Sequence, residues 1–438
     1  MNWFEGAVFY QIYTLGFCGA PWGNDGIRQN RIGKVNGWIS HFKKLGIDAV
    51  YFCPVFESDS HGYDTKDFRQ IDCRLGSNAD FKEIVQNLHN NNIKVVLDGV
   101  FNHTGTNFWA FEDVKLYREN SQYKDWFYID FSKQGAYGAP FYYEGWEEHF
   151  ELVRLNLKNQ SLIDYLLDAI KFWISEFDID GVRLDVAYVL DADFIKRLRY
   201  EIKALKEDFL LLGEAIHGDY NRLVNDEMLD SCTDYVCYKG FYSSFNDNNL
   251  FEIAYSLKHQ FGAQGIYKGK SLLEFADNHD VSRLASILKN KAHLPLVYAL
   301  LFAIGGNPCI YYGSEWGAEG IRSEKDDKTI RPYFETAQEN ALTQHIINLI
   351  KIRKENETLI NGSYNEIFVS NQQLIFERQS CCCEPAKFLI CINSSPNEYN
   401  TQFNYPTFEA IDLLTNAPID FKGSLKLPAN SAMYLKIK

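Results

Sequence analysis

The sequence lacks any apolar run long enough to cross a membrane and any dense cluster of basic residues. Its most apolar stretch, Leu294–Ile304, is too short to span about 30 Å of hydrocarbon and is followed by Gly305 and Gly306. We therefore expect a buried helix there and no membrane partner. The 58 acidic residues outnumber the 44 basic ones and give a net charge of -14. Because such a chain repels phosphates, we also expect no nucleic-acid partner.

A secretion signal and metal-binding cysteine spacings are also missing. Residues Met1–Gly6 have no charged segment, apolar segment or small-residue cleavage site, so we expect a cytoplasmic protein. Several of the 10 cysteines lie in apolar, strand-like runs, where a reduced thiol behaves as a small hydrophobe. The triple Cys381–Cys383 has no CxxC or CxxH spacing, so a loop or sheet edge is favoured over a metal site.

The pattern of apolar residues predicts an α/β protein up to about residue 355. Short β-branched or aromatic runs alternate with longer amphipathic segments, as parallel strands and crossover helices do. Eight such strands favour a closed (β/α)8 TIM barrel over an open sheet. The predicted strands are Val8–Tyr13, Ile47–Cys53, Lys94–Val100, Ile179–Asp185, Phe209–Ala215, Asp234–Tyr238, Leu272–Asn278 and Asn307–Tyr312. The predicted helices include Asn36–Leu45, Asn78–Asn92, Gln160–Phe177, Ala192–Lys206 and Ala337–Lys354.

Two further segments depart from this alternation. The aromatic-rich connection after the third strand is too long for a structureless loop, so residues 104–155 are predicted to form a small inserted domain. The barrel would then comprise residues 1–103 and 156–360. From residue 361 to 438 the pattern is one of strands and turns, which predicts a C-terminal all-β sandwich domain. Its first strands are predicted at Glu366–Ser370, Gln373–Glu377 and Ala386–Ile392.

Polar residues interrupt four of the apolar runs at their carboxyl ends, where a strand-helix barrel places its reactive groups. These ends read Asp98–His103, Gly181–Asp185, Gly213-Glu214 and Asn278–Asp280. Arg183 and Asp185 are two residues apart on one strand, so their side chains point to the same side. An arginine beside a carboxylate keeps that carboxylate ionised and oriented, as a nucleophile requires.

Glu214 follows the apolar run Phe209–Gly213, where burial and nearby carboxylates would raise its pKa and let it donate a proton. One ionised aspartate, one protonatable glutamate and a further pair, His279 and Asp280, suit glycoside hydrolysis with retention. In that reaction an acid/base and a nucleophile lie about 5–5.5 Å apart. Each of these aspartates alone is as compatible with a helix cap or a loop position as with a catalytic role. Four carboxylate-bearing strand ends together make unrelated caps a poor explanation.

In this order and with these residues, the four segments resemble the α-amylase family of glycoside hydrolases, and the resemblance covers nearly the whole chain. It implies that Asp185 is the nucleophile, Glu214 the general acid/base and Asp280 the transition-state stabiliser. Other residues implied to bind substrate are Tyr63, His103, Arg183 and His279 around the attacked glucose, and Asp327 and Arg331 at the next sugar. Sugar rings stack on aromatic faces, and charged planar groups bind hydroxyl pairs.

Within the family, Leu155–Asn159 resembles a Leu-Asn motif of the neopullulanase and cyclomaltodextrinase branch, which degrades short maltodextrins. Two features depart from the branch. After Asp185 the chain has Val186–Val189, where secreted amylases have a Lys-His pair and the neopullulanase branch has an Asn-Glu pair. The missing histidine is a usual calcium ligand of the family. Asn102 matches another calcium ligand, so the resemblance implies no required cofactor and leaves calcium open. The barrel also begins within ten residues, so we expect no dimer through an N-terminal β-domain and leave the oligomeric state undecided.

The sequence therefore predicts an intracellular retaining α-glucan hydrolase. It would cut α-1,4 bonds of maltooligosaccharides or cyclodextrins, with α-1,6 cleavage as an additional activity. One alternative is a 4-α-glucanotransferase or sugar isomerase on the same residues, with Trp109, Trp126 and Trp146 acting either as acceptor platforms or as core. The other is a non-catalytic glycan-binding relative, which is disfavoured because all three carboxylates are present.

Overall fold

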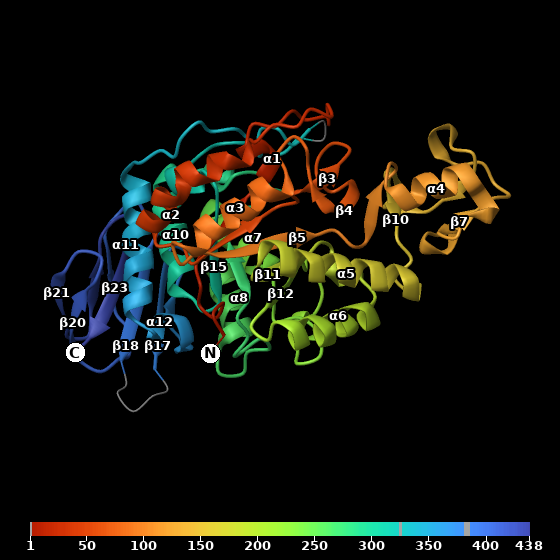
Figure 1. The fold of residues 1–438 in the computed structure, drawn as a ribbon. Coiled ribbons are helices and arrows are strands. Elements are labelled where there is room, and N and C mark those ends of the chain that lie inside the picture. The colour runs from red at the N-terminus through yellow and green to blue at the C-terminus, as the bar shows by residue number, and fades with distance from the viewer. Residues whose placement is uncertain (1, 324–325, 381–385) are drawn as a thin grey trace.

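The computed structural model describes residues 2–323, 326–380 and 386–438. The cysteine triple Cys381–Cys383 lies outside these residues. A central barrel carries the segment around helix α4 at one end and the C-terminal sheet at the other (Figure 1).

The barrel has eight parallel strands. They are hydrogen-bonded in the order β13-β12-β11-β5-β2-β1-β15-β14. A parallel bridge between Thr233, which follows β13, and Leu273 at the start of β14 closes the ring. The predicted (β/α)8 TIM barrel is therefore confirmed. The strands are β1 (Phe9–Ile12), β2 (Ala49–Phe52), β5 (Lys94–Gly99), β11 (Gly181–Leu184), β12 (Leu210–Gly213), β13 (Ser231–Cys232), β14 (Leu273–Phe275) and β15 (Asn307–Tyr311).

Helices cover the outside of the barrel, so the strands are buried on both faces. Helix α5 begins where the sequence predicts, because the Asn159 side chain accepts from the Leu162 amide and caps it. Helix α10 is the buried helix predicted at Leu294–Ile304. The helices are α1 (Thr14–Phe17), α2 (Ile39–Leu45), α3 (Asn78–His89), α4 (Trp109–Tyr117), α5 (Gln160–Phe177), α6 (Ala192–Leu205), α7 (Tyr235–Asn246), α8 (Phe251–Phe261), α9 (Leu284–Ile287), α10 (Leu294–Ala303), α11 (Ala341–Glu355) and α12 (Thr358–Asn361). None of these described helices is long and apolar enough to span a membrane.

The prediction of the sixth strand at Asp234–Tyr238 is wrong. The strand is β13, which ends at Cys232, and α7 begins at Tyr235. Asp234 caps this helix, since its Oδ1 accepts from the amides of Val236 and Cys237 at 3.0 Å each. The β-formers that follow therefore lie in the first turn of a helix, because a satisfied cap outweighs their weak strand preference.

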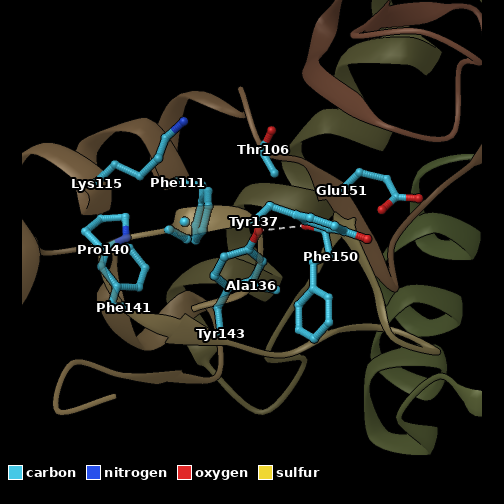
Figure 2. A pocket seen from close by; sticks show the side chains of 12 residues that line it. Thr106, Phe111, Lys115, Ala136, Tyr137, Pro140, Phe141, Tyr143, Phe150 and Glu151 are labelled. Atoms are coloured by element: carbon cyan, nitrogen blue, oxygen red, sulfur yellow. Dashed lines mark hydrogen bonds between the residues drawn. The ribbon is translucent and has the colours of Figure 1, made fainter. Parts of the chain in front are cut away.

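The segment between β5 and α5 contains its own small sheet, in the order β6-β10-β9, and a ribbon of β7 and β8. Aromatic side chains pack beneath α4, among them Trp126, whose ring lies 5.6 Å from that of Trp109. An aromatic-lined hollow of about 340 Å³ opens here beside Tyr137 and Phe150 (Figure 2). The strands are β6 (His103–Gly105), β7 (Ile129–Asp130), β8 (Tyr142–Tyr143), β9 (Gly145–Trp146) and β10 (His149–Arg154). A further hairpin, β3 (Phe56–Ser58) and β4 (Thr65–Ile71), lies between β2 and α3.

The C-terminal part is an antiparallel sheet in the order β16-β17-β18-β23-β20-β21. Its two faces bury different side chains: Leu374 and Phe376 pack in the barrel's core cluster, whereas Ile375 between them packs in an outer cluster. The ribbon β19-β22 contributes Leu425 and Leu427 to that outer cluster. The strands are β16 (Ser363–Val369), β17 (Gln373–Gln379), β18 (Lys387–Asn393), β19 (Tyr399–Thr401), β20 (Phe408–Asp412), β21 (Ala417–Phe421), β22 (Leu425–Leu427) and β23 (Ser431–Ile437).

Candidate active site

The predicted catalytic carboxylates meet at the carboxyl ends of the barrel strands. Asp185 directly follows β11 and Glu214 directly follows β12, and the two strands pair in parallel. Asp98 lies in the neighbouring strand β5, level with Arg183 of β11. The barrel register alone therefore brings these side chains to one mouth.

A single guanidinium holds three carboxylates at this mouth. Arg183 Nη1 donates to both oxygens of Asp98 at 2.9 and 3.0 Å and to Oδ1 of Asp185 at 2.8 Å. Its Nη2 lies 2.8 Å from Oε1 of Glu214. All four side chains are buried. Sequence reasoning placed Arg183 beside Asp185, and the structure shows that it also orients Glu214 and Asp98.

Burial and charge act together on the acidity of this cluster. Burial raises the pKa of Asp185 well above its usual value and also raises that of Glu214, and in both groups the Arg183 charge opposes the rise. The pKa of Asp98 is raised by burial as well. Since three carboxylates face one cation, the cluster retains a proton at a higher pH than an isolated carboxyl group does.

The backbone between Asp185 and Glu214 is shaped to hold the glutamate. The Val186 amide donates to Oε2 of Glu214 at 2.9 Å. To do so Val186 adopts a left-handed conformation, with φ 43° and ψ 42°, which is strained for a β-branched residue. Gly213 admits this approach, because a Cβ there would lie 2.9 Å from Cβ of Ala187 in the same turn. Residues of the first turn after each strand thus fix the side chain of Glu214.

A second charged group faces the first from the end of β14. Nε2 of His279 lies 3.0 Å from Oδ2 of Asp280, and Arg331 Nη2 contacts Oδ1 of Asp280 at 3.0 Å. The same Nη2 lies 3.1 Å from Asp327. The Asp280 side chain is 31% exposed. Burial raises the pKa of Asp280, but His279, Arg331 and Arg183 outweigh it, so this pKa is lowered and Asp280 stays ionised.

Hydrogen bonds fix the tautomer of His279. Nδ1 faces the Gln11 amide nitrogen at 2.8 Å and must accept from it, so Nε2 carries the proton. Burial lowers the pKa of His279 to about 3, which keeps the ring neutral. Tyr63 contacts Nε2 and donates to Asp98 at 3.0 Å, and its ring stacks on His279 with centroids 5.6 Å apart. Tyr63 thereby connects the two charged groups.

His103 presents an unused donor to the same mouth. The Asn102 amide nitrogen lies 3.1 Å from its Nδ1, so Nε2 carries the proton. Nε2 has no close hydrogen-bond acceptor among the described residues, and the ring interacts with the Tyr63 backbone at longer range. Burial lowers the pKa of His103 to about 3. The ring stacks against Trp146 of β9 with centroids 6.1 Å apart. A buried donor without a close acceptor, beside an aromatic ring, is suited to a sugar hydroxyl.

The alpha-amylase catalytic-domain model matches residues 11–345, which is most of the chain and includes every residue of this mouth. The protein belongs to the α-amylase family. Among its relatives is a maltogenic alpha-amylase of Bacillus acidopullulyticus, 31% identical over 92% of this chain and 72% of the relative. An intracellular maltogenic amylase of Bacillus subtilis is 30% identical over 83% of this chain and 64% of the relative. A solved cyclomaltodextrinase superposes with a TM-score of 0.87 at 25% identity, covering 100% of this chain and 78% of that one.

The potential metal ligands around Asn102 fit a calcium ion poorly. The main-chain carbonyl oxygen of Asn102 accepts from the Leu155 amide at 2.9 Å, and its side-chain nitrogen faces His103. The described residues contain three clusters of His, Cys, Asp or Glu ligands, around Cys53, Glu57 and Asp234, and none of the three includes His103, the neighbour of Asn102. Calcium prefers six or more oxygen ligands, several of them carboxylates.

The three tryptophans of the inserted segment differ in position. Trp126 is buried, whereas Trp109 is 37% exposed, packs against Trp126 and donates to the Tyr165 hydroxyl. Trp146 alone of the three stacks on a predicted substrate-binding residue, His103. Only Trp146 is therefore placed to contact a sugar at this mouth.

Three residues that hydrogen-bond to the side chains of this site were given no role from the sequence. Asp98 binds Arg183, Tyr51 donates to Asp98 at 3.0 Å, and Gln11 orients His279. Asp98 and Gln11 share one signal, since each is a polar residue within an otherwise apolar strand. A polar side chain in such a position is costly unless it has a partner inside the barrel.

Proposed function

We propose that this glycoside hydrolase cleaves α-1,4 bonds of maltooligosaccharides or cyclodextrins with retention, through a glycosyl-enzyme on Asp185. The observation that carries the proposal is the shared contact of Asp185 and Glu214 with Arg183 at 2.8 Å each. Adjacent nitrogens of one guanidinium place the two carboxyl groups close together, as retaining glycosidases require. Cleavage of α-1,6 bonds belongs to the same proposal as an additional activity.

In the first step, protonated Glu214 gives its proton to the glycosidic oxygen while an oxygen of Asp185 attacks the anomeric carbon. The glycosidic bond breaks and an ester to Asp185 forms. In the second step, Glu214 takes a proton from water, which attacks the anomeric carbon and releases Asp185. Arg183 stabilises whichever of the two carboxylates is ionised at each stage.

The remaining groups bind and polarise the sugar. Ionised Asp280 faces the positive charge that develops on the attacked ring, and Arg331 holds it in place. The rings of Tyr63 and His279 give the glucose a flat surface, and His103 Nε2 donates to a hydroxyl group. Asp327, paired with Arg331, contacts the next sugar.

The names of the relatives support this substrate class: two are maltogenic amylases and one is a cyclomaltodextrinase. We also propose a cytoplasmic location, which the intracellular relative of Bacillus subtilis supports. No calcium ion is needed in this proposal, since the catalytic groups described above position one another directly.

The test is a time course with maltoheptaose, β-cyclodextrin, panose and pullulan, with the anomeric form of fresh products read by proton NMR. We expect shorter α-anomeric products from maltoheptaose or β-cyclodextrin. β-Anomeric first products would contradict retention. The absence of any product would favour a glycan-binding protein.

The position of Trp146 favours one second candidate, a glucanotransferase. An aromatic ring beside His103 can hold an acceptor sugar in place of water. Products longer than maltoheptaose would then appear early, and Trp146→Ala would reduce them relative to hydrolysis. If the product ratio of this variant equals that of the parent, Trp146 does not act as an acceptor platform.

A further inference from the structure

A second hollow, of about 590 Å³, opens next to the charged group around Asp280. It is distinct from the aromatic hollow of the inserted segment and is formed by the chain after β1 and the chain before α11. Its volume suffices for a sugar residue with a substituent. The side chains relevant here are Trp22, Gln29, Arg31, Lys328, Arg331 and Tyr333.

The hollow is strongly cationic in a protein of net charge -14. Arg31, Lys328 and Arg331 line it, and no described lining side chain is acidic. Two acidic neighbours, Asp280 and Asp327, pair with Arg331 at 3.0 and 3.1 Å and compensate its charge. Within the part of the chain that the structure describes, neither Arg31 nor Lys328 forms an ion pair with a carboxylate. Two cations in one concave site without counter-charges attract anions.

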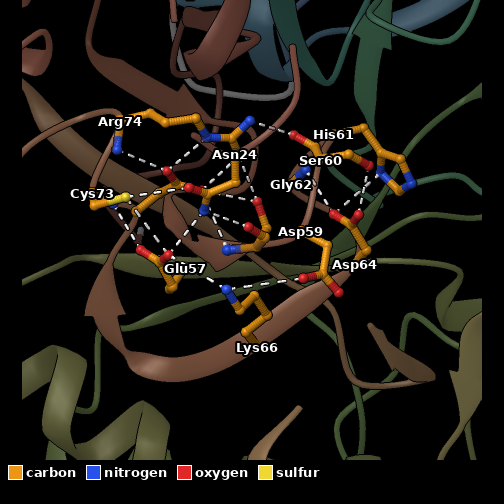
Figure 3. A network of polar contacts seen from close by, with 12 residues as sticks. Asn24, Glu57, Asp59, Ser60, His61, Gly62, Asp64, Lys66, Cys73 and Arg74 are labelled. Carbon is orange, nitrogen blue, oxygen red and sulfur yellow. Dashed lines mark hydrogen bonds and ion pairs between the residues drawn. The ribbon is translucent and has the colours of Figure 1, made fainter. Parts of the chain in front are cut away.

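The wall that carries Trp22 is held rigidly by a buried arginine. Arg74 Nη1 donates to the carbonyl oxygens of Pro21, Trp22 and Ser60 at 3.0, 3.0 and 2.7 Å. Its Nη2 pairs with Asp72 at 2.7 Å. Figure 3 shows Arg74 and Ser60 in the polar network that also contains Asn24 and Glu57. This wall of the hollow is therefore preformed, which favours ligand binding because a ligand need not order it.

Aromatic rings and further charge complete the walls. Lys328 Nζ lies 5.7 Å from the ring centre of Trp22. Tyr333 is 49% exposed, and Lys34 Nζ lies 3.5 Å from the centre of its ring. Rings of this kind stack on a sugar, whereas the ammonium and guanidinium groups select its substituent.

The hollow is continuous with the proposed catalytic site. Arg331 lines it and also donates to Asp280 at 3.0 Å. The Arg331 guanidinium lies 4.5 Å from the ring centre of Tyr13, whose ring neighbours both His279 and Trp22. A chain that places glucose against His279 and its next sugar against Arg331 extends directly into this hollow.

We propose that this hollow binds a phosphate monoester carried by the sugar next to the attacked glucose, so that the substrates include phosphorylated maltooligosaccharides. This inference rests on the proposed hydrolase function. A phosphate presents oxygens that Arg31 and Lys328 bind through charge-assisted hydrogen bonds, while Trp22 contacts the ring. A neutral hydroxyl group would bind to these two cations much more weakly than a phosphate, because it does not compensate their charges.

The test compares kcat/KM for maltotriose and for maltotriose phosphorylated at O6 of its non-reducing glucose. We expect the parent to prefer the phosphorylated sugar at least about tenfold, and Arg31→Gln or Lys328→Gln to reduce that ratio about tenfold each. Arg28→Gln is the matched control, since Arg28 lies on the same exposed chain segment but does not line the hollow. We expect this control to keep the parental ratio. Added sodium chloride should lower the preference, because the cations are partly exposed.

A parental ratio near one, or a preference that both glutamine variants retain, would overturn the phosphate assignment. If neither sugar is hydrolysed, the proposed function fails instead, so the two failures are distinguishable. A parallel titration with inorganic phosphate separates the sources of the anion. Competitive inhibition of maltotriose hydrolysis, weakened by Lys328→Gln, supports a phosphate site. Sugar 1-phosphate among the products would overturn the assignment, since free phosphate would then be a reactant.

Discussion

Replacing Asp98 by asparagine tests the idea that three buried carboxylates share the charge of Arg183. The substitution removes one negative charge while leaving an oxygen in the place of Oδ2, which accepts from both Arg183 and Tyr63. The lost charge lowers the pKa values of the remaining carboxyl groups in two ways. Glu214 and Asp185 lose a repelling neighbour, and the guanidinium is less neutralised, so the pKa of each remaining carboxyl group falls.

The size of the shift follows from Coulomb's law. Two unit charges about 6 Å apart, on either side of one guanidinium, interact by about 3 kcal/mol at an effective dielectric constant of about 20. That energy corresponds to about two pKa units, and screening reduces it, so we expect a fall of about one to two units. In the parent, the raised pKa of Glu214 keeps the acid protonated to higher pH. The alkaline limb of activity therefore moves to lower pH in the variant.

The assay is kcat/KM for maltotriose as a function of pH, for the parent, Asp98→Asn and Asp164→Asn. Asp164 is an exposed aspartate that pairs with Arg197 on the surface of α5 and α6, so its variant should keep the parental profile. An alkaline limb that stays in place or moves upward in Asp98→Asn would refute the shared-charge argument, whatever happens to the maximal rate.

Three other outcomes are expected. Asp185→Asn should lower kcat by at least about 10⁴-fold while maltotriose still binds by calorimetry, and substantial residual turnover would contradict a nucleophilic role. Dialysis against EDTA should leave kcat and Tm unchanged, because Arg183 and its carboxylate partners hold one another without an ion; a loss that calcium restores would refute this. Phe376→Ala should lower the free energy of unfolding by about 3–5 kcal/mol in urea titrations, since Phe376 is fully buried between the C-terminal sheet and the barrel. A cost below about 1 kcal/mol would show that the sheet does not stabilise the barrel through this contact.

Local signals in the sequence predicted most elements of the barrel because each is determined by neighbouring residues. Helix α5 is an example, since Asn159 caps its first turn and the apolar positions recur with the helical period. The prediction of the sixth strand was wrong because its position is not determined by neighbouring residues in the sequence. The strand β13 is only two residues long, too short for an alternating pattern, and its place depends on pairing with Leu212 and Gly213 of β12.

The candidate site was predictable as a set of strand-end residues, but the hydrogen bonds and ion pairs between them were not. That Arg183 reaches Glu214 depends on the register between β11 and β12, which pairs Arg183 with Leu212. The contact by which Gln11 orients His279 joins residues that are 268 positions apart in the sequence. The cationic hollow likewise combines Arg31 with Lys328, which no local pattern relates. Contacts of this kind follow from the closure of the barrel.

The measurement that tests the central claim most directly is covalent labelling with 5-fluoro-α-D-glucopyranosyl fluoride, followed by peptide mapping by mass spectrometry. The fluorine at C5 withdraws electrons and slows both the formation and the hydrolysis of the glycosyl-enzyme. The fluoride leaving group at C1 makes the formation fast again, so the glycosyl-enzyme accumulates. The account predicts one sugar per chain, on the peptide that contains Asp185, and no label in Asp185→Asn. A label on another carboxylate, or rapid turnover without any covalent adduct, would contradict it.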